Sequence, residues 1–319
     1  MREQFKQKAT FVLKYFVGFA LLFWVLARIN RQQMVETLLK IRWQTLFIVL
    51  LVAFVNLVIQ FLRWKYLVEQ QSNDYRKKDL IPSFFAGFTF RLLLPGGHAE
   101  ISKVFLLPGK KSGKVMAFAI EKFFQTYVKT VLVLGGLPFL FPRYRTLFWA
   151  ILLLVLGVYP FLPRLMRSRL FRKFQEKEVN YHPIFFRAFV YSLGVFASLI
   201  VQYYVVLNDA HRISFLHTLL TVIYIWGAGL IPVSVSGLGV RENIAAYMLQ
   251  RYGVPASSAV GLALLIFFIN AIVPALIGVY FVYRRQHHFK EAKDTLRNVS
   301  QRLYNKGKKN VAKKWRSSG

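Results

Sequence analysis

The stretch that decides the fold reads LLLPGGHAEISKVFLL and covers residues 92–107. Pro95, Gly96 and Gly97 end an apolar run, because proline lacks a backbone N–H donor and glycine readily adopts non-helical angles. Glu100 and Lys103 follow, three residues apart, so they share one face of a helix that begins after the break. Charges beside such a break predict two short helices that meet inside a larger apolar body.

The rest of the chain has the composition of a membrane protein. Of its 319 residues, 55% are hydrophobic and 17% aromatic, whereas apolar residues make up under about half of a soluble domain. Several apolar runs reach the length of about 20 residues that a helix needs to cross a bilayer. We therefore expect an all-α, polytopic membrane helix bundle with about six full spans. These are residues 10–27, 43–62, 115–140, 147–162, 184–207 and 258–283.

Two further apolar segments are too short or too interrupted to be ordinary spans. Residues 80–94 lead into Pro-Gly-Gly, and residues 215–233 lead into SVSGLGVREN. If both segments turn back inside the membrane, Lys and Arg concentrate on one side, which the positive-inside rule makes the cytoplasm. Both termini are then cytoplasmic. Two re-entrant segments on opposite faces are typical of an inverted repeat, and such broken helices mark the binding sites of transporters.

The second break repeats the plan of the first, with glycines followed by charged residues at the start of a helix. Gly237 and Gly239 are followed by Arg241, Glu242 and Asn243, which open a new helix. The start of a helix carries free N–H groups and the positive end of the helix dipole, so it suits an anionic group such as a lipid phosphate. The alternative is that the carboxylates at the two breaks only stabilise the helix starts.

A third set of polar residues lies within an expected span. Glu121, Gln125 and Lys129 are spaced at i, i+4 and i+8, roughly one helix face. A charge at the centre of a span costs about 2.5–3.5 kcal/mol, so it usually faces a cavity or a partner. The alternative places Glu121 near the membrane interface. The candidate substrate-binding residues are Arg91, Gly96, Gly97, Glu100, Lys103, Glu121, Lys129, Gly237, Gly239, Arg241, Glu242 and Asn243.

The net charge of +31 would indicate nucleic-acid binding in a soluble protein. In a membrane protein, Lys and Arg collect in cytoplasmic loops and beside anionic headgroups, so we expect no nucleic-acid partner. Residues 1–283 are predicted to form the transmembrane domain. Residues 284–319 are predicted to form a basic amphipathic tail that lies on the anionic leaflet.

Patterns typical of enzymes and metal sites are missing from the sequence. It has no cysteine, no HExxH pattern, no Gly-x-Ser-x-Gly elbow and no Walker A loop. We therefore expect a protein that is not an enzyme and that holds no metal or cofactor.

Several segments resemble one known family. LLLPGGHAEISKVFLL with the following AFAIEKFF, RWKYL at 63–67, and IPVSVSGLGVREN at 231–243 resemble signatures of the lysylphosphatidylglycerol synthase transmembrane region, also called flippase-like integral membrane proteins. The sequence departs from the family pattern mildly, with Lys103 and Lys122 where Arg is common and Ser236 where Gly often stands. The soluble aminoacyl-transferase domain of the full-length synthases is not found, so aminoacyl transfer is not carried over.

The resemblance implies lipid translocation in the bacterial inner (cell) membrane. Arg91, Lys103, Lys129 and Arg241 would supply positive charge to a phospholipid or lipid-linked headgroup. Glu100, Glu121 and Glu242 would pair with these cations, or would bind a cationic part of the headgroup or a coupling proton. Two alternatives stay open: a membrane-embedded transferase acting on lipid-linked substrates, and a non-transporting anchor for a partner enzyme that docks on the basic tail.

Overall fold

The computed structural model describes residues 23–284 except Val25, Arg28, 94–98, 169–174 and 231–236. Every element in these residues is a helix, and no strand occurs among them. The predicted all-α bundle is therefore confirmed. Most of the predicted span 10–27, almost all of the predicted tail, and Gly96 and Gly97 lie outside the described residues.

In the part of the chain that the structure describes, five helical runs are long and apolar enough to cross a membrane. They confirm five of the six predicted spans, and each is longer than predicted because the helices continue into polar residues at their ends. Three of the runs are single helices: α3 (Trp43–Gln71), α6 (Ser112–Leu140) and α10 (Tyr181–His211). The run Pro142–Met166 contains α7 (Arg145–Val158) and α8 (Leu162–Met166). The run Ala256–Arg284 contains α13 (Ala256–Phe267), a π-helical turn (Phe268–Ile272) and α14 (Val273–Arg284).

The remaining helices are short. Apart from α2 (Arg31–Leu39), they form two pairs, which we call the first and second hairpins. The first hairpin consists of α4 (Lys77–Leu93), the 3-10 turn Ala99–Ile101 and α5 (Ser102–Phe105); the second consists of α11 (Phe215–Ala228) and α12 (Val240–Gln250).

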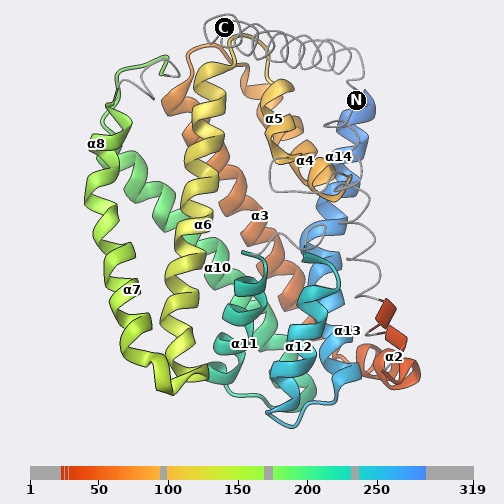
Figure 1. The fold of residues 1–319 in the computed structure, drawn as a ribbon. Helices are drawn as coiled ribbons and strands as arrows, with labels where there is room; N and C mark the ends of the chain where they lie inside the picture. Colours follow the sequence, from red (N-terminus) through yellow and green to blue (C-terminus); the bar gives the residue numbers. More distant parts are fainter. Residues whose placement is uncertain are drawn as a thin grey trace, which may run out of the picture.

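The two hairpins enter the bundle from opposite ends. In Figure 1, α4 and α5 occupy the upper part of the bundle, α11 and α12 occupy the lower part, and neither pair crosses it completely. The chain follows the same order twice: α3, first hairpin, α6, and later α10, second hairpin, α13 with α14. This order and the opposite entry are the arrangement that the sequence predicted for an inverted repeat.

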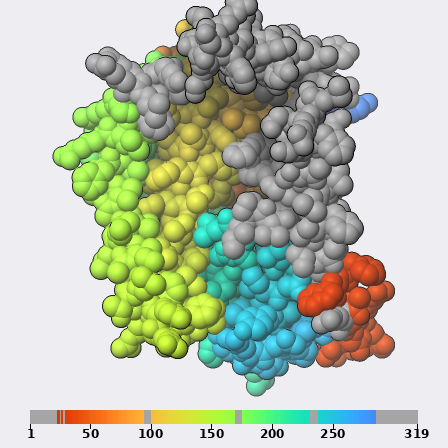
Figure 2. Space-filling model, in the orientation of Figure 1, coloured from red at the N-terminus to blue at the C-terminus, as the bar shows by residue number. Residues whose placement is uncertain are grey.

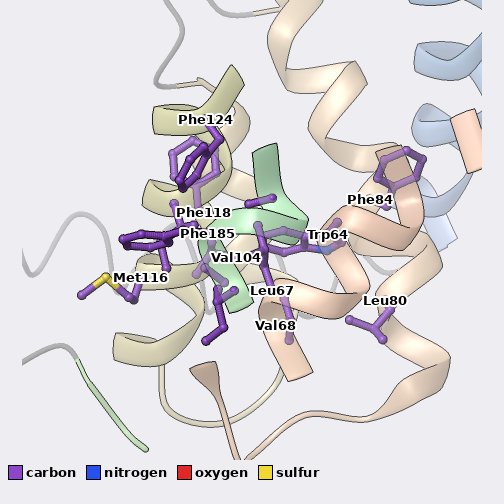
Figure 3. Packing of buried hydrophobic residues seen from close by; sticks show 14 of the residues in the cluster. Trp64, Leu67, Val68, Leu80, Phe84, Val104, Met116, Phe118, Phe124 and Phe185 are labelled. Atoms are coloured by element: carbon purple, nitrogen blue, oxygen red, sulfur yellow. The ribbon is translucent and has the colours of Figure 1, made fainter. Parts of the chain in front are cut away.

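Each hairpin packs into a hydrophobic cluster of its own. The first cluster joins α3, α4, α5, α6 and α10 around Trp64, Phe84 and Phe124 (Figure 3). The second cluster joins the opposite halves of α3 and α10 to α11, α12 and α13 around Val206 and Leu249. Helices α3 and α10 therefore run through both clusters and connect the two halves of the molecule.

Helix α7 lies at one side of the bundle, where Figure 2 shows the side chains of α6 and α7 as a continuous outer layer. Its outer face is apolar: Leu153 and Leu154 are 68% and 69% exposed. Such a large exposed apolar face is unusual on a soluble monomer. An apolar face of this kind is expected where a helix contacts the lipid of a membrane.

Candidate functional site

A cavity of about 320 Å³ lies between the two hairpins. Its walls come from α3, α4, α6, α10, α11, α13 and the start of α12. The volume falls within the range of about 300–1,000 Å³ that is usual for ligand pockets. The cavity is therefore the place where the interrupted helices of both halves meet a space that can hold a ligand.

The charged side chains on the cavity wall are mostly cationic. Among the described residues, Arg91, Lys122, Lys129 and Arg241 line the cavity, against the single carboxylate of Glu100. Glu100 Oε1 accepts a hydrogen bond from Arg91 Nη1 at 3.5 Å, and its other oxygen pairs with Lys122 Nζ. Within the described part of the chain, Lys129 forms no ion pair. The cavity thus has an excess of positive charge that protein carboxylates do not balance.

A second group of charges lies deeper, beside the cavity. Glu121 of α6 accepts from Arg63 Nη2 of α3 at 3.1 Å and from Lys103 Nζ of α5 through its other oxygen. The Lys103 ammonium also lies 4.0 Å from the centroid of the Trp64 ring. All three charged side chains are buried. Because a buried charge is tolerated only when it is paired, Glu121 holds α3, α5 and α6 together.

The start of α12 is built around a glycine. Gly239 has φ 80°, a left-handed conformation that suits glycine. The backbone N–H of Gly239 donates to Glu242 Oε2 at 2.7 Å, and Asn243 Nδ2 donates to the Gly239 carbonyl at 2.6 Å. Glu242 is wholly buried. This geometry agrees with the alternative in which Glu242 stabilises the helix start.

Arg241, next to that cap, is oriented differently. It lines the cavity, and its guanidinium lies 4.3 Å from the centroid of the Phe267 ring. Arg241 Nη2 stands 4.0 Å from Glu242 Oε1. The distance is too long for a hydrogen bond, so Arg241 remains available to the cavity.

Uncharged polar side chains form another part of the wall. Asn56, Gln60, Tyr203 and Asn270 line the cavity from α3, α10 and the π-helical turn. Asn270 and Gln202 exchange hydrogen bonds of 2.6 and 3.3 Å. π-Helical turns inside longer helices occur frequently at functional sites. Here the turn carries the Asn270 amide within an otherwise apolar helix.

The structure places the predicted site residues in three groups. Those that line the cavity are Arg91, Glu100, Lys129, Gly237 and Arg241. Lys103 and Glu121 lie in the adjacent buried cluster, and Gly239, Glu242 and Asn243 form the start of α12. Gly96 and Gly97 lie outside the described residues. The structure thus brings the described candidates together; their roles toward a substrate stay predictions.

The sequence-based reasoning missed Arg63 and the amide groups of Asn56, Gln60 and Asn270. Arg63 immediately follows the predicted span 43–62, yet α3 continues to Gln71 and buries it. A longer helix would have placed Arg63 inside the bundle, and a lone Arg at that depth would have indicated a carboxylate partner. The amides gave no comparable signal, because single Asn and Gln residues in apolar runs have no distinctive spacing.

The model of a protein family described as the lysylphosphatidylglycerol synthase transmembrane region matches residues 11–278. The chain belongs to this family. Both hairpins and all residues that line the cavity lie within the match. No curated protein matches the chain. Together with its five membrane-spanning runs, membership of the lysylphosphatidylglycerol synthase transmembrane-region family makes the chain an integral membrane protein with a lipid-related role.

Proposed function

We propose that this protein is a lipid flippase that moves a phospholipid or a lipid-linked headgroup between the leaflets, with the cavity as its binding site. One observation carries the proposal: a cavity, lined within the described residues by four cationic side chains and one carboxylate, lies between two hairpins that enter from opposite ends. Paired interrupted helices around a central site are characteristic of transporters with alternating access.

The charge of the cavity supports a phosphate as the recognised group. Cations inside a membrane domain are costly, and they are usually retained where they serve a function. An anionic headgroup would balance the excess charge at Lys129 and Arg241. The same cavity has apolar lining at Phe196, Trp226 and Ile266, which suits the glycerol ester region of a lipid.

We place the first-hairpin end of the bundle at the cytoplasm of a bacterial inner membrane. The helices there begin or end beside basic pairs, Lys77 with Lys78 and Lys110 with Lys111, and basic residues favour the cytoplasmic side. The predicted tail, which follows α14 at the same end, would then lie on the anionic cytoplasmic leaflet. We propose transport without catalysis, so no metal or cofactor takes part.

Lipid exchange in proteoliposomes tests the proposal. Wild-type protein should accelerate the movement of a labelled anionic phospholipid between leaflets. Lys129→Met should slow it about tenfold or more, since a charged hydrogen bond contributes roughly 1.5–3 kcal/mol. Lys78→Met, an exposed lysine at the start of α4, is the matched control and should exchange at the wild-type rate.

Two results would contradict the proposal. The first is exchange no faster than in protein-free liposomes for every lipid tested. The second is an equal rate for Lys129→Met and wild type at equal protein density, which would remove the cavity from the transport path.

A further inference from the structure

We infer that the cavity selects a lipid phosphate esterified to an uncharged, hydroxyl-rich group, such as glycerol or a larger polyol, and disfavours a headgroup that carries an ammonium. This deepens the proposed function by naming the substrate class of the same site. The family description alone would lead one to expect the opposite, a lysine-bearing headgroup.

Among the described residues, no carboxylate near the cavity is available to bind an ammonium. Glu100 is held by Arg91 and Lys122. Both oxygens of Glu121 are occupied by buried cations. Glu242 is wholly buried and does not line the cavity, and one of its oxygens accepts from the backbone at the start of α12. An ammonium in the cavity would therefore meet cations without a free counter-charge among the described residues, and like charges repel.

The uncharged polar part of the cavity wall, which we call the neutral wall, has hydrogen-bonding groups without a partner among the described residues; they belong to Gln60, Gln125 and Tyr203. Gln60 Nε2 donates to Asn56 Oδ1, and within the described residues Gln60 Oε1 has no hydrogen-bond partner. Gln125 Oε1 accepts from Lys122 at 3.0 Å, which leaves its amide N–H groups without a partner in the described structure. The hydroxyl of Tyr203, on the same cavity wall, has none there either. Groups that both donate and accept match hydroxyls.

The neutral wall is held in position by hydrogen bonds from Asn56 to α10. Asn56 Nδ2 donates to the Val195 carbonyl at 2.9 Å and also to Ser198 Oγ. Asn56 is itself buried, so it fixes the amide plane of Gln60. A polar site that is preorganised for hydroxyls discriminates strongly against a ligand that lacks them, because its own groups are then left unpaired.

The cavity is also small. Its volume of about 320 Å³ is at the lower end of the range for ligand pockets. It has room for a phosphate and one compact polar group, while the acyl chains stay outside in the lipid.

Binding measurements on the purified protein in detergent test this inference without requiring transport. The ligands are phosphatidylglycerol, phosphatidylinositol, phosphatidylethanol, lysylated phosphatidylglycerol and the soluble glycerol 3-phosphate. The two hydroxyl-rich lipids should bind about tenfold more tightly than phosphatidylethanol, which is also a singly charged phosphodiester but has no hydroxyl; this is the effect of one or two hydrogen bonds. Lysylated phosphatidylglycerol should bind more weakly than phosphatidylglycerol. Equal or tighter binding of the lysylated lipid would overturn the inference, and equal binding of glycerol 3-phosphate would overturn a lipid as the ligand.

Two variants assign the preference to the neutral wall. Tyr203→Phe and Gln60→Leu should reduce the preference for phosphatidylglycerol over phosphatidylethanol about tenfold, because phosphatidylethanol has no hydroxyl for these side chains to bind. Tyr204→Phe is the control, because the neighbouring Tyr204 packs on Phe215 and does not line the cavity. An unchanged preference in both cavity variants would overturn the assignment.

The two proposals fail separately. If the protein shows the headgroup preference but no lipid exchange, the proposed transport is contradicted and the inferred ligand class stands. If the protein exchanges lipids but shows no headgroup preference, the proposed transport stands and the inferred ligand class is overturned.

Discussion

The two hairpins are built from the same ingredients and use their carboxylates differently. In the first hairpin, Glu100 pairs with cations of α4 and α6, and Lys103 pairs with Glu121. In the second hairpin, Glu242 bonds to the backbone of its own helix start, and Arg241 is left to the cavity. The first hairpin is thus tied to its neighbours by ion pairs, whereas the second carries its positive charge without a hydrogen-bonded carboxylate.

The difference shows that a helix interruption at glycines, followed by a Glu and a basic residue, does not determine which group the Glu binds. The partner of the Glu depends on the helix that packs beside it. Helix α6 brings Lys122 to Glu100, while α13 presents the aromatic ring of Phe267 to Arg241. The cavity consequently receives its available cations mainly from Arg241 and Lys129.

The largest expected loss of stability comes from disrupting the buried ion cluster of Arg63, Lys103 and Glu121. Glu121→Leu should destabilise the protein by about 3–5 kcal/mol, because Arg63 and Lys103 would stay buried without a carboxylate. Reversible unfolding in mixed detergent measures this. Adding Lys103→Met to that variant should recover part of the loss, since one unpaired charge is removed. A loss below about 1 kcal/mol for Glu121→Leu would mean that the cluster does not tie the first hairpin in place.

The next effect concerns how closely the first hairpin packs on α14. A Cβ at Gly278 would overlap the Phe85 carbonyl and Thr89 Oγ1 of α4. Gly278→Ala should therefore cost about 1–3 kcal/mol through overpacking, seen as a lower midpoint of thermal unfolding. Gly261→Ala is the control, because its Cβ would meet mainly the flexible side chain of Met34. Equal losses in the two variants would show that α4 can move away from α14 freely.

A smaller effect is expected at the start of the second hairpin's α12. Glu242→Ala should cost about 1 kcal/mol, the usual value of a lost helix cap. Glu242→Gln should cost less, because the amide oxygen can still accept from Gly239. The same unfolding assay gives both values. If Glu242→Ala were as damaging as Glu121→Leu, the contrast between the two hairpins would disappear.

The smallest effect is a pH dependence at the first-hairpin end. Burial by itself raises the pKa of Glu176, but hydrogen bonds from the Gly113 N–H and the Ser112 and Ser72 hydroxyls outweigh it and lower the pKa below its usual value. A lowered pKa contributes stability above the unfolded pKa, and this stability is lost as the pH falls through the folded pKa.

The loss should be roughly 1 kcal/mol or less, because water screens a partly exposed carboxylate. Thermal unfolding between neutral pH and about pH 3.5 measures it. Glu176→Gln should flatten this part of the profile. If the stability of Glu176→Gln fell with pH as steeply as that of the wild type, other carboxylates would be responsible for the pH dependence.

Most of the fold could be predicted from the sequence, because apolar runs of sufficient length and Gly/Pro interruptions are local signals. Five spans, both interrupted segments and their entry from opposite ends followed from hydropathy and from the distribution of Lys and Arg. The helix ends could not be placed, since the polar ends of α3 and α10 are stabilised by contacts that no local pattern reveals.

The site was predictable in part. Arg91, Glu100, Lys129 and Arg241 were identified because charges in apolar segments are conspicuous. Which cation meets which carboxylate depends on how helices far apart in the sequence pack, so the pairing of Arg63 with Glu121 could not be inferred. The contribution of Gln60 to the cavity likewise depends on α10, which supports it through Asn56.

The two separate hydrophobic clusters bear on how the chain assembles during synthesis. The ion cluster needs only α3, α5 and α6, so its charges can be paired as soon as α6 enters the membrane. The first hydrophobic cluster also contains Ile184 and Phe185 of α10 and Ala275 of α14. The first hairpin is synthesised early, but its packing is complete only when α14 has been inserted. Until then, the ion pairs of Glu121 with Arg63 and Lys103 keep these buried charges from being unpaired in the membrane.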